Sequence, residues 1–158
     1  MRKRVSILGS GISGVGAAIL AKDEGYEVFV SDSNEITSNV KNKLDFISIP
    51  WEENKHSYAE LKKSDLVIKS PGISNESEII VKLKNSNVKI ISEIEFASTH
   101  TNSFIIGITG SNGKTTTTKL IYHILKNSGL NVGIAGNIGT SFSKQIAENK
   151  FDYYVLEI

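Results

Sequence analysis

Short apolar runs alternate along the chain with stretches whose apolar side chains recur at helical spacing. Seven runs, several rich in Val and Ile, have the length of β-strands: Val5–Leu8, Val28–Val30, Leu66–Ile68, Val88–Ile91, Phe104–Ile108, Val132–Ala135 and Tyr153–Leu156. Helical spacing is found within Gly14–Glu24, Glu76–Asn85 and Lys114–Asn127, the last followed by Gly129 as a C-terminal cap. Strands that alternate with helices of roughly ten to fifteen residues predict βαβ units. We therefore expect an α/β fold built on a mostly parallel, doubly wound sheet.

Composition narrows the range of functions. The 158 residues carry 18 Lys and Arg against 17 Asp and Glu, and this net charge of +1 gives no support for nucleic-acid binding. No run approaches the roughly 18 apolar residues of a membrane span, so we expect no membrane association. The absence of cysteine excludes disulfides and thiolate catalysis, and it is compatible with a cytoplasmic protein. His56, His100 and His123 lack metal-ligand spacing and are interpreted as surface or packing residues.

A glycine-rich loop follows the first predicted strand. Val5–Leu8 leads into Gly9-Ser10-Gly11-Ile12-Ser13-Gly14, a complete G-x-G-x-x-G between a strand and a helix. Such glycines allow a tight turn and a close approach of the backbone to a diphosphate, which the free N–H groups of the helix N-terminus bind. The second strand leads to Asp32, an acid placed to accept hydrogen bonds from a ribose. The pattern favours a nucleotide ligand with a diphosphate, although such glycines also occur where only the turn and the packing require them.

A second loop, Gly110-Ser111-Asn112-Gly113-Lys114-Thr115-Thr116, joins the strand Phe104–Ile108 to an amphipathic helix. Backbone N–H groups of such a loop bind phosphate oxygens, Lys114 can reach the terminal phosphates, and the Thr115 hydroxyl can ligate Mg²⁺. The glycine spacing is tighter than in the usual P-loop, whose first glycine would fall at Ile108. This shorter pattern indicates a distinct subclass of ATP-binding loop.

Two strand–loop–helix units, about a hundred residues apart, indicate two nucleotide sites and two domains. The best boundary lies near Ser92–Glu95, which divides the chain into a Rossmann-like domain, 1–93, and the start of a P-loop-type α/β ATP-binding domain, 94–158. The last predicted strand, Tyr153–Leu156, is followed only by Glu157 and Ile158. We therefore expect a complete first domain and a truncated second one.

These motifs together resemble the Mur ligases of peptidoglycan synthesis. Thr109–Thr116 is similar to the ATP loop of these enzymes and of the related folylpolyglutamate synthases. The preceding Gly9–Gly14 loop matches the members that add the first and the second amino acid. Ser70–Ile73, Ser92–Phe96 and Gly136–Gly139 resemble the branch that adds D-glutamate.

The resemblance implies an ATP-dependent acid–amino-acid ligase that acts in the cytoplasm as a monomer. ATP, with Mg²⁺, would phosphorylate the L-alanyl carboxylate of UDP-N-acetylmuramoyl-L-alanine, and the amine of D-glutamate would then displace phosphate from the acyl phosphate. The family also requires a histidine and a modified lysine later in the central domain, and a C-terminal domain. We therefore expect this chain to bind the UDP-sugar without turnover.

The same resemblance assigns roles to residues at matching positions. The UDP-sugar would be bound by Gly11, Ile12, Ser13, Gly14, Asp32, Ser33, Asn34, Gly72 and Asn137. ATP would be bound by Gly110, Ser111, Asn112, Gly113, Lys114, Thr115 and Thr116. Lys114 and Asn137 would act in catalysis, and Thr115 and Glu157 would ligate Mg²⁺. From its position alone, Glu157 at the end of an apolar strand is either a metal ligand or a solvated charge.

Other interpretations stay open at this point. An NAD(P)-dependent oxidoreductase would use the first glycine loop and Asp32 but would leave the Lys114 loop unexplained. A non-catalytic nucleotide-binding module would bind ATP without the UDP-sugar. Within the family, the alternative is a ligase that adds L-alanine. Because a partial second sheet has an unpaired edge, we also expect residues 96–158 to be less ordered than 1–92 or to dimerise through that edge.

Overall fold

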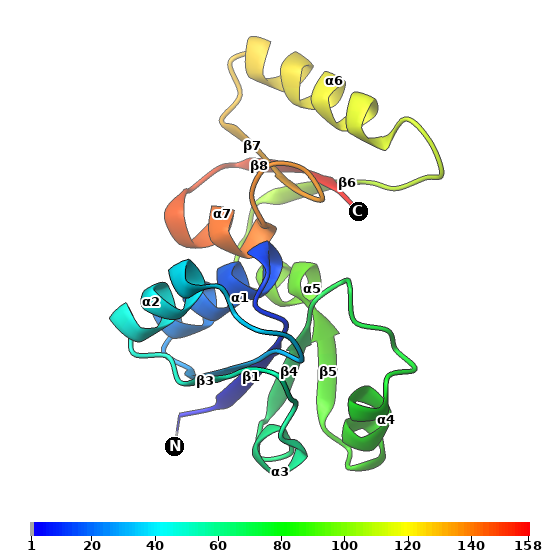
Figure 1. Ribbon diagram of the computed structural model, residues 1–158. Helices are drawn as coiled ribbons and strands as arrows, with labels where there is room; N and C mark the ends of the chain where they lie inside the picture. The colour runs from blue at the N-terminus through cyan, green and yellow to red at the C-terminus, as the bar shows by residue number, and fades with distance from the viewer. Residues whose placement is uncertain (1) are drawn as a thin grey trace.

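The computed structural model describes residues 2–158, which form two parallel β-sheets joined through helices (Figure 1). In chain order the elements are β1 (Arg4–Leu8), α1 (Ile12–Asp23), β2 (Glu27–Ser31), α2 (Ser38–Phe46), β3 (Trp51–Glu52), α3 (Tyr58–Leu61), β4 (Leu66–Lys69), α4 (Glu78–Asn85), β5 (Lys89–Ser92), α5 (Glu93–Ser98), β6 (Phe104–Ile108), α6 (Lys114–Asn127), β7 (Val132–Gly136), α7 (Phe142–Glu148) and β8 (Tyr153–Glu157). The α/β fold class predicted from the sequence is confirmed.

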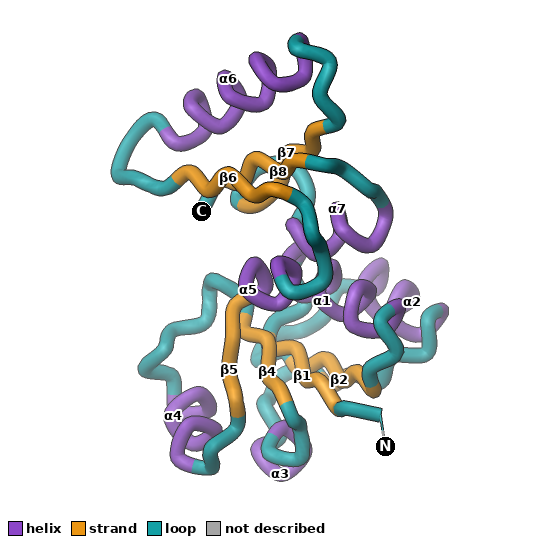
Figure 2. The backbone as a smooth tube through the Cα atoms, turned by 180° about the vertical axis from the view of Figure 1, so that it is seen from behind, coloured by secondary structure: helices purple, strands orange, loops and turns teal. Residues whose placement is uncertain are grey.

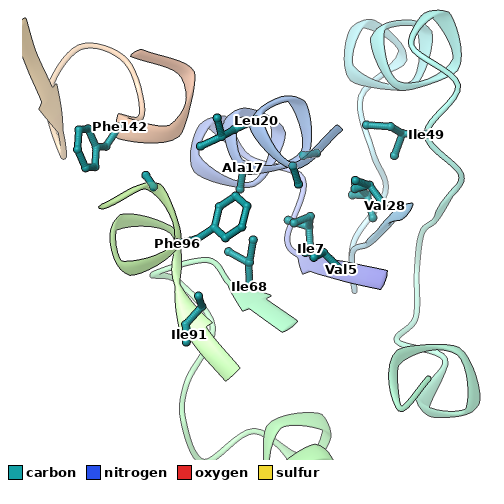
Figure 3. Close-up of a cluster of buried hydrophobic side chains, with 14 of the residues drawn as sticks. Val5, Ile7, Ala17, Leu20, Val28, Ile49, Ile68, Ile91, Phe96 and Phe142 are labelled. Carbon is teal, nitrogen blue, oxygen red and sulfur yellow. The ribbon is translucent and has the colours of Figure 1, made fainter. Parts of the chain in front are cut away.

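The first sheet has five parallel strands in the order β3-β2-β1-β4-β5. The strand order reverses at β1, which opens a crevice at the carboxyl ends of β1, β2 and β4. Side chains of β1 alternate between the two faces of the sheet: Val5 and Ile7 belong to the core beneath α1, whereas Leu8 packs with Leu61 and Val67 on the side of α3 and α4. Figure 3 shows the core beneath α1, which reaches from β2 to β5.

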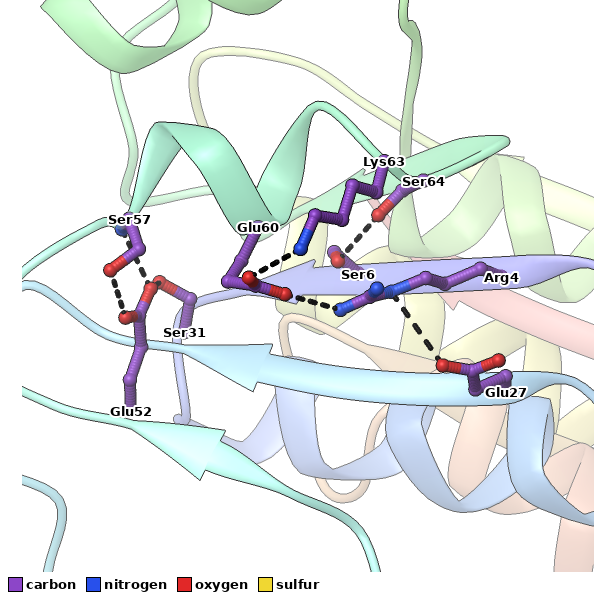
Figure 4. Close-up of polar contacts among 9 residues, drawn as sticks. All are labelled: Arg4, Ser6, Glu27, Ser31, Glu52, Ser57, Glu60, Lys63 and Ser64. Atoms are coloured by element: carbon purple, nitrogen blue, oxygen red, sulfur yellow. Dashed lines mark hydrogen bonds and ion pairs between the residues drawn. The ribbon is translucent and has the colours of Figure 1, made fainter.

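Polar pairs fasten α3 and the turn after it to β1. Arg4 donates a hydrogen bond to Glu60 at 3.1 Å, and its Nε lies 3.9 Å from Glu27 (Figure 4). The buried hydroxyls of Ser6 and Ser64 lie 2.6 Å apart. Because a buried hydroxyl without a partner costs about 1–3 kcal/mol, this pairing lets two serines occupy the interior of the sheet face.

The second sheet has three parallel strands in the order β6-β8-β7. The central strand β8 is buried at Tyr154, Val155 and Leu156, and α6 packs against all three strands. The edge strand β6 is more open, since its Phe104 is 65% exposed. This sheet is therefore smaller and less covered than the first one.

Helix α7 packs on α1 and α5 of the first part of the chain and on β7 of the second sheet (Figure 2). The contact with α1 is close, because a Cβ added at Gly16 would lie 2.0 Å from the hydroxyl oxygen of Ser141. Phe142 is fully buried and joins Phe96 of α5 and Tyr154 of β8 in one continuous core. The two sheets are therefore held together through a shared apolar core.

The seven strands predicted from the sequence are all confirmed, and the three predicted helices correspond to α1, α4 and α6. Gly129 follows α6 with a left-handed φ of +80°, and its N–H donates to the Lys126 carbonyl, as expected of a cap. The sequence did not predict the two-residue strand β3 or the helices α2, α3, α5 and α7. Across residues 2–158, none of the helices combines the length and the apolar character needed to cross a membrane.

Candidate functional site

The loop after β1 turns tightly into α1. Gly9 has a φ of +94°, and Gly14 is buried so closely that a Cβ would lie 1.8 Å from the Gly9 carbonyl oxygen. Gly11, which directly precedes α1, differs because a Cβ there would meet nothing within 4 Å. The loop itself therefore requires glycine at 9 and 14. At 11 the glycine leaves open space beside the helix N-terminus, as the approach of a diphosphate requires.

Asp32 holds this loop from the end of β2. Its Oδ2 accepts hydrogen bonds from the N–H and the hydroxyl of Ser10 at 2.6 and 2.7 Å, and its Oδ1 accepts from the N–H of Asn34 at 2.9 Å. Burial acts to raise the pKa of Asp32, but the hydrogen bonds from Asn34 and Ser10 and the nearby His56 outweigh it and hold the pKa below its usual value. The ionised carboxylate thus shapes the glycine loop.

A cavity of about 450 Å³ opens beside this loop, among the residues that follow β1, β2 and β4. Seven of the nine predicted UDP-sugar residues line it: Gly11, Ile12, Ser13, Asp32, Ser33, Asn34 and Gly72. Gly9, Ser70, Pro71 and Ile73 complete the lining and were not predicted. Gly14 is buried in the first turn of α1, and Asn137 directly follows β7 of the second sheet, so these two predicted residues do not line the cavity.

The Ser-Pro-Gly loop that forms one wall is held by a lysine at the end of β4. Lys69 Nζ donates to the Ile73 carbonyl at 2.5 Å, and the Ile73 N–H donates to the Ser70 carbonyl at 3.1 Å. A Cβ added at Gly9 would lie 2.7 Å from the Ser70 hydroxyl, so the two loops touch. Lys69 therefore fixes the wall that carries Gly72, a role that the sequence did not reveal.

A second cavity, of about 580 Å³, adjoins the first and shares Ser33, Gly72 and Ile73 with it. His56 and Tyr58 also line this second cavity. The spacing of the histidines predicts only a surface or packing role for His56. The side chain is half-buried, as packing requires, but its place beside the nucleotide-type cavity was not predicted.

His56 is joined to β2 and β3 by a chain of hydrogen bonds. Its Nδ1 lies 2.7 Å from the hydroxyl of the fully buried Ser31, and that hydroxyl donates to Glu52 Oε1 at 2.8 Å. Figure 4 shows Glu52 bridging Ser31 and Ser57. Burial acts to raise the pKa of Glu52, but the bonds from Ser57 and Ser31 and the charge of Lys55 lower it overall. Ser31, Glu52 and His56 meet because β3 pairs with β2 in parallel register, which places Ser31 opposite Glu52.

The loop between β6 and α6 forms a separate site on the second sheet. Gly113 immediately precedes α6 and has a left-handed φ of +74°. Lys114 Nζ donates to the Gly110 carbonyl at 2.7 Å and so spans its own loop. Six of the seven predicted ATP residues line a cavity of about 290 Å³: Ser111, Asn112, Gly113, Lys114, Thr115 and Thr116. Gly110, the seventh, accepts the hydrogen bond from Lys114 through its carbonyl but does not line the cavity.

Glu157 lines the same cavity from the end of β8. Its side chain is 7% exposed, and its Oε2 is buried without a hydrogen-bond partner among the described residues. An unpartnered buried carboxylate oxygen is costly, and a divalent cation would satisfy it. Mg²⁺ is commonly held by one or two carboxylates together with substrate phosphates, so Glu157 and the Thr115 hydroxyl suit it. Residues 2–158 contain no cluster of three or more His, Cys, Asp or Glu that could hold a metal without such phosphates.

Asn137 stands beside Glu157 at the end of β7. Its N–H donates to the Glu157 carbonyl at 2.9 Å, and a Cβ at Gly136 would lie 2.3 Å from that carbonyl oxygen. The close pairing of β7 with β8 therefore fixes Asn137 next to the candidate metal ligand. The residue is exposed, and it lines neither the glycine-loop cavity nor the Lys114 cavity.

Two family models match the chain. The model of the MurD N-terminal domain matches residues 4–79, and the model of the Mur ligase middle domain matches residues 108–158. The first match contains the glycine loop, Asp32 and Gly72, and the second contains the Lys114 loop, Asn137 and Glu157. Both candidate sites thus lie in regions that are similar to Mur ligases.

Curated relatives match the chain over nearly all of its length. The UDP-N-acetylmuramoylalanine–D-glutamate ligase of Bacteroides fragilis is 54% identical over 156 residues, which are 99% of this chain and 35% of that protein. The ligase of the same name from Christiangramia forsetii is 50% identical over 158 residues, which are 100% of this chain and 36% of that protein. The chain therefore spans about one third of the length of these relatives.

A solved structure shares the fold. The UDP-N-acetylmuramate:L-alanyl-γ-D-glutamyl-meso-diaminopimelate ligase from Neisseria meningitides superposes with a TM-score of 0.64 at 23% sequence identity. The match covers 99% of this chain and 52% of that one. The similarity therefore extends across both sheets and the helices between them.

Proposed function

The chain belongs to the Mur ligase family, and we propose that it is the N-terminal part of an ATP-dependent ligase that adds D-glutamate to UDP-N-acetylmuramoyl-L-alanine. One observation carries this proposal: the chain has two separate nucleotide-type cavities, each built on the loop between a parallel strand and its following helix. A ligase that joins a nucleotide-linked substrate to an amino acid at the expense of ATP needs two such sites.

In this proposal the first cavity, on a domain of residues 1–93, takes the UDP part of the substrate. Gly11 and Ser13 at the start of α1 would bind the diphosphate through their backbone and the positive end of the helix. Asp32, Ser33 and Asn34 would border the ribose and the uracil, and Gly72 would close the pocket from the wall that Lys69 holds.

The second cavity, at the start of a domain from residue 94, takes ATP. Lys114 would leave the Gly110 carbonyl and turn its ammonium group toward the terminal phosphates. Thr115 and Glu157 would hold Mg²⁺, and the bound ion would neutralise part of the phosphate charge. Asn137, fixed beside Glu157, would contact both substrates where they meet.

The chemistry proposed for the whole enzyme has two steps. The terminal phosphoryl group of ATP passes to the L-alanyl carboxylate and ADP leaves. The amine of D-glutamate then attacks the acyl phosphate, loses a proton and expels phosphate as the amide bond forms. Lys114 contributes by binding and orienting the phosphates, because phosphoryl transfer depends mainly on position and electrostatics.

The other interpretations have less support. An NAD(P)-dependent oxidoreductase gives no role to the Lys114 loop or to the unpartnered Glu157 carboxylate. A module that binds ATP alone gives no role to the first cavity. An L-alanine-adding ligase is disfavoured because the relatives at 54% and 50% identity are named for D-glutamate. We propose a monomeric cytoplasmic enzyme, of which these residues bind substrates without turning them over.

Calorimetry with the 158-residue chain tests the proposal. UDP-N-acetylmuramoyl-L-alanine is expected to bind and NAD⁺ is not, and no D-glutamate-dependent release of phosphate is expected. The matched variant is Gly11→Ser, because serine is a favoured N-cap residue and its Cβ meets nothing within 4 Å of the present fold. This variant should retain its melting temperature and its ATP binding while its affinity for the UDP-sugar falls.

NAD⁺ binding that exceeds binding of the UDP-sugar would contradict the proposed function. Unchanged affinity of Gly11→Ser for the UDP-sugar would show that the diphosphate does not lie at this loop. Release of phosphate that depends on D-glutamate would refute the expectation that these residues do not turn over alone.

A further inference from the structure

The cavity that contains His56 continues from the proposed nucleotide cavity, because Ser33, Gly72 and Ile73 line both. His56 and Asp32 are close enough for the charge of each to shift the pKa of the other. Because the two cavities are continuous at Ser33 and Gly72, a nucleotide whose ribose lies at Asp32 has room to extend its base into the His56 cavity. This step rests on the proposed function, which places the nucleoside beside Asp32.

The hydrogen bonds of Ser31 determine which nitrogen of His56 carries the proton. A serine hydroxyl has a single proton, and at Ser31 the carboxylate of Glu52 is its stronger and closer acceptor, 2.8 Å away against 3.4 Å to the Lys55 carbonyl. The Ser31 oxygen must then accept from His56, so His56 carries its proton on Nδ1. Nε2, the other ring nitrogen, makes no hydrogen bond within residues 2–158 and is left as an acceptor.

The surroundings favour this neutral ring at neutral pH. Burial lowers the pKa of His56, and this effect exceeds the opposing influence of the Asp32 and Glu52 carboxylates. The ring therefore presents a lone pair on Nε2, held in a fixed orientation by the bond from Nδ1 to Ser31.

We propose that His56 selects the base of the bound nucleotide by accepting a hydrogen bond from the N3–H of uracil at Nε2. Uracil carries a proton on N3, whereas the N3 of cytosine carries a lone pair. A cytosine held in the same position would set two lone pairs against each other and leave both without a partner. Because two polar groups would then be buried without a partner, UDP should bind at least about tenfold more tightly than CDP.

Two variants of His56 separate base selection from a purely structural role. An asparagine amide can occupy the place of Nδ1 and keep the bond to Ser31, but it is too short to reach the place of Nε2. A glutamine amide reaches the place of Nε2 and offers an acceptor oxygen, but it gives up the bond to Ser31. Calorimetry of UDP and CDP binding to the wild-type chain, His56→Asn and His56→Gln gives the ratio of the two affinities in each.

The wild-type chain should prefer UDP at least about tenfold, His56→Gln should keep much of that preference, and His56→Asn should lose it. Equal affinity of the wild-type chain for UDP and CDP would overturn the proposal without any variant. Equal ratios in the two variants, or a preference that survives in His56→Asn, would also overturn it. Failure of UDP to bind at all would instead refute the proposed function, and this inference with it.

Discussion

Glu93 provides a test of how the two sheets are joined. It is the first residue of α5 and only 4% exposed, and its Oε1 accepts a hydrogen bond from the N–H of Ser143 at 2.5 Å. Ser143 lies in the first turn of α7, whose N–H groups have no partners within the helix. This carboxyl group thus adds a buried polar bond between α7 and α5 to the apolar core that they share. Replacing Glu93 by alanine should leave the Ser143 N–H buried without its partner.

The size of the effect follows from that missing bond. A buried N–H without a partner costs about 1–3 kcal/mol, and for a typical slope of ~2 kcal/mol per molar urea this lowers the denaturation midpoint by about 0.5–1.5 M. Glu95→Ala is the matched control, because Glu95 is an exposed neighbour in the same helix and should change the free energy of unfolding by less than about 0.5 kcal/mol.

The variant Glu93→Gln keeps the acceptor oxygen and removes the charge, so it isolates the effect of ionisation. Burial raises the pKa of Glu93, and the hydrogen bond from Ser143 opposes this only in part. A carboxyl group whose pKa is raised by folding stabilises the folded chain fully at pH values below its ordinary pKa, which is 4.5 for Glu93. That contribution is lost as pH rises through the pKa of the folded state. Wild-type and Glu93→Gln chains should therefore be equally stable near pH 4, and the glutamine variant should be the more stable at neutral pH.

Urea denaturation followed by circular dichroism over this pH range measures both effects. If Glu93→Ala unfolds at the same midpoint as Glu95→Ala, the Glu93–Ser143 bond does not hold α7. If the wild-type chain gains stability relative to Glu93→Gln as pH rises, the carboxyl group is not destabilised by burial and the reasoning is wrong.

Two further predictions concern the candidate sites. Lys114→Met should abolish measurable binding of Mg²⁺·ATP in calorimetry and leave UDP-sugar binding unchanged, because the Lys114 ammonium group bonds to the Gly110 carbonyl of its own loop and lies outside the UDP-sugar cavity; ATP binding at wild-type affinity would contradict its role. Asp32→Asn should destabilise the chain by about 1 kcal/mol at neutral pH in urea denaturation, since an amide cannot accept all the bonds from Ser10 and Asn34. Because the pKa of Asp32 is lowered on folding, this difference should shrink as pH falls below its ordinary value of 3.8, and a constant difference would refute the assignment.

The strands and the two glycine-containing loops could be predicted because each has a local signal. An apolar run marks a buried strand, and a glycine pattern between a strand and a helix marks a phosphate-type loop. Helix α2 escaped prediction because its apolar stripe is short: Leu44 is the only one of its nine residues that is buried, and only Val40 within the helix packs on the core beside it. Strand β3 is only two residues long and gives no pattern.

The residues that sequence reasoning missed come together through tertiary structure. Ser31, Glu52 and His56 meet through the pairing of β2 with β3, and no spacing of residues along the chain predicts that contact. The docking of α7 on α1 depends on Gly16, whose neighbour Ser141 is far away in sequence. Conversely, Asn137 was expected between the two substrates, and the structure places it beside Glu157 but in neither cavity.

The proposed function requires two nucleotide sites on this chain, one for a UDP-sugar and one for ATP. Mapping of backbone amide NMR shifts, with UDP-N-acetylmuramoyl-L-alanine and Mg²⁺·ATP added in turn, tests it most directly. The UDP-sugar should shift amides of residues 9–14, 32–34 and 70–73, and Mg²⁺·ATP should shift those of residues 110–116 and 157. If both ligands shift the same loop, or if saturating NAD⁺ displaces the UDP-sugar from the first loop, the account is contradicted.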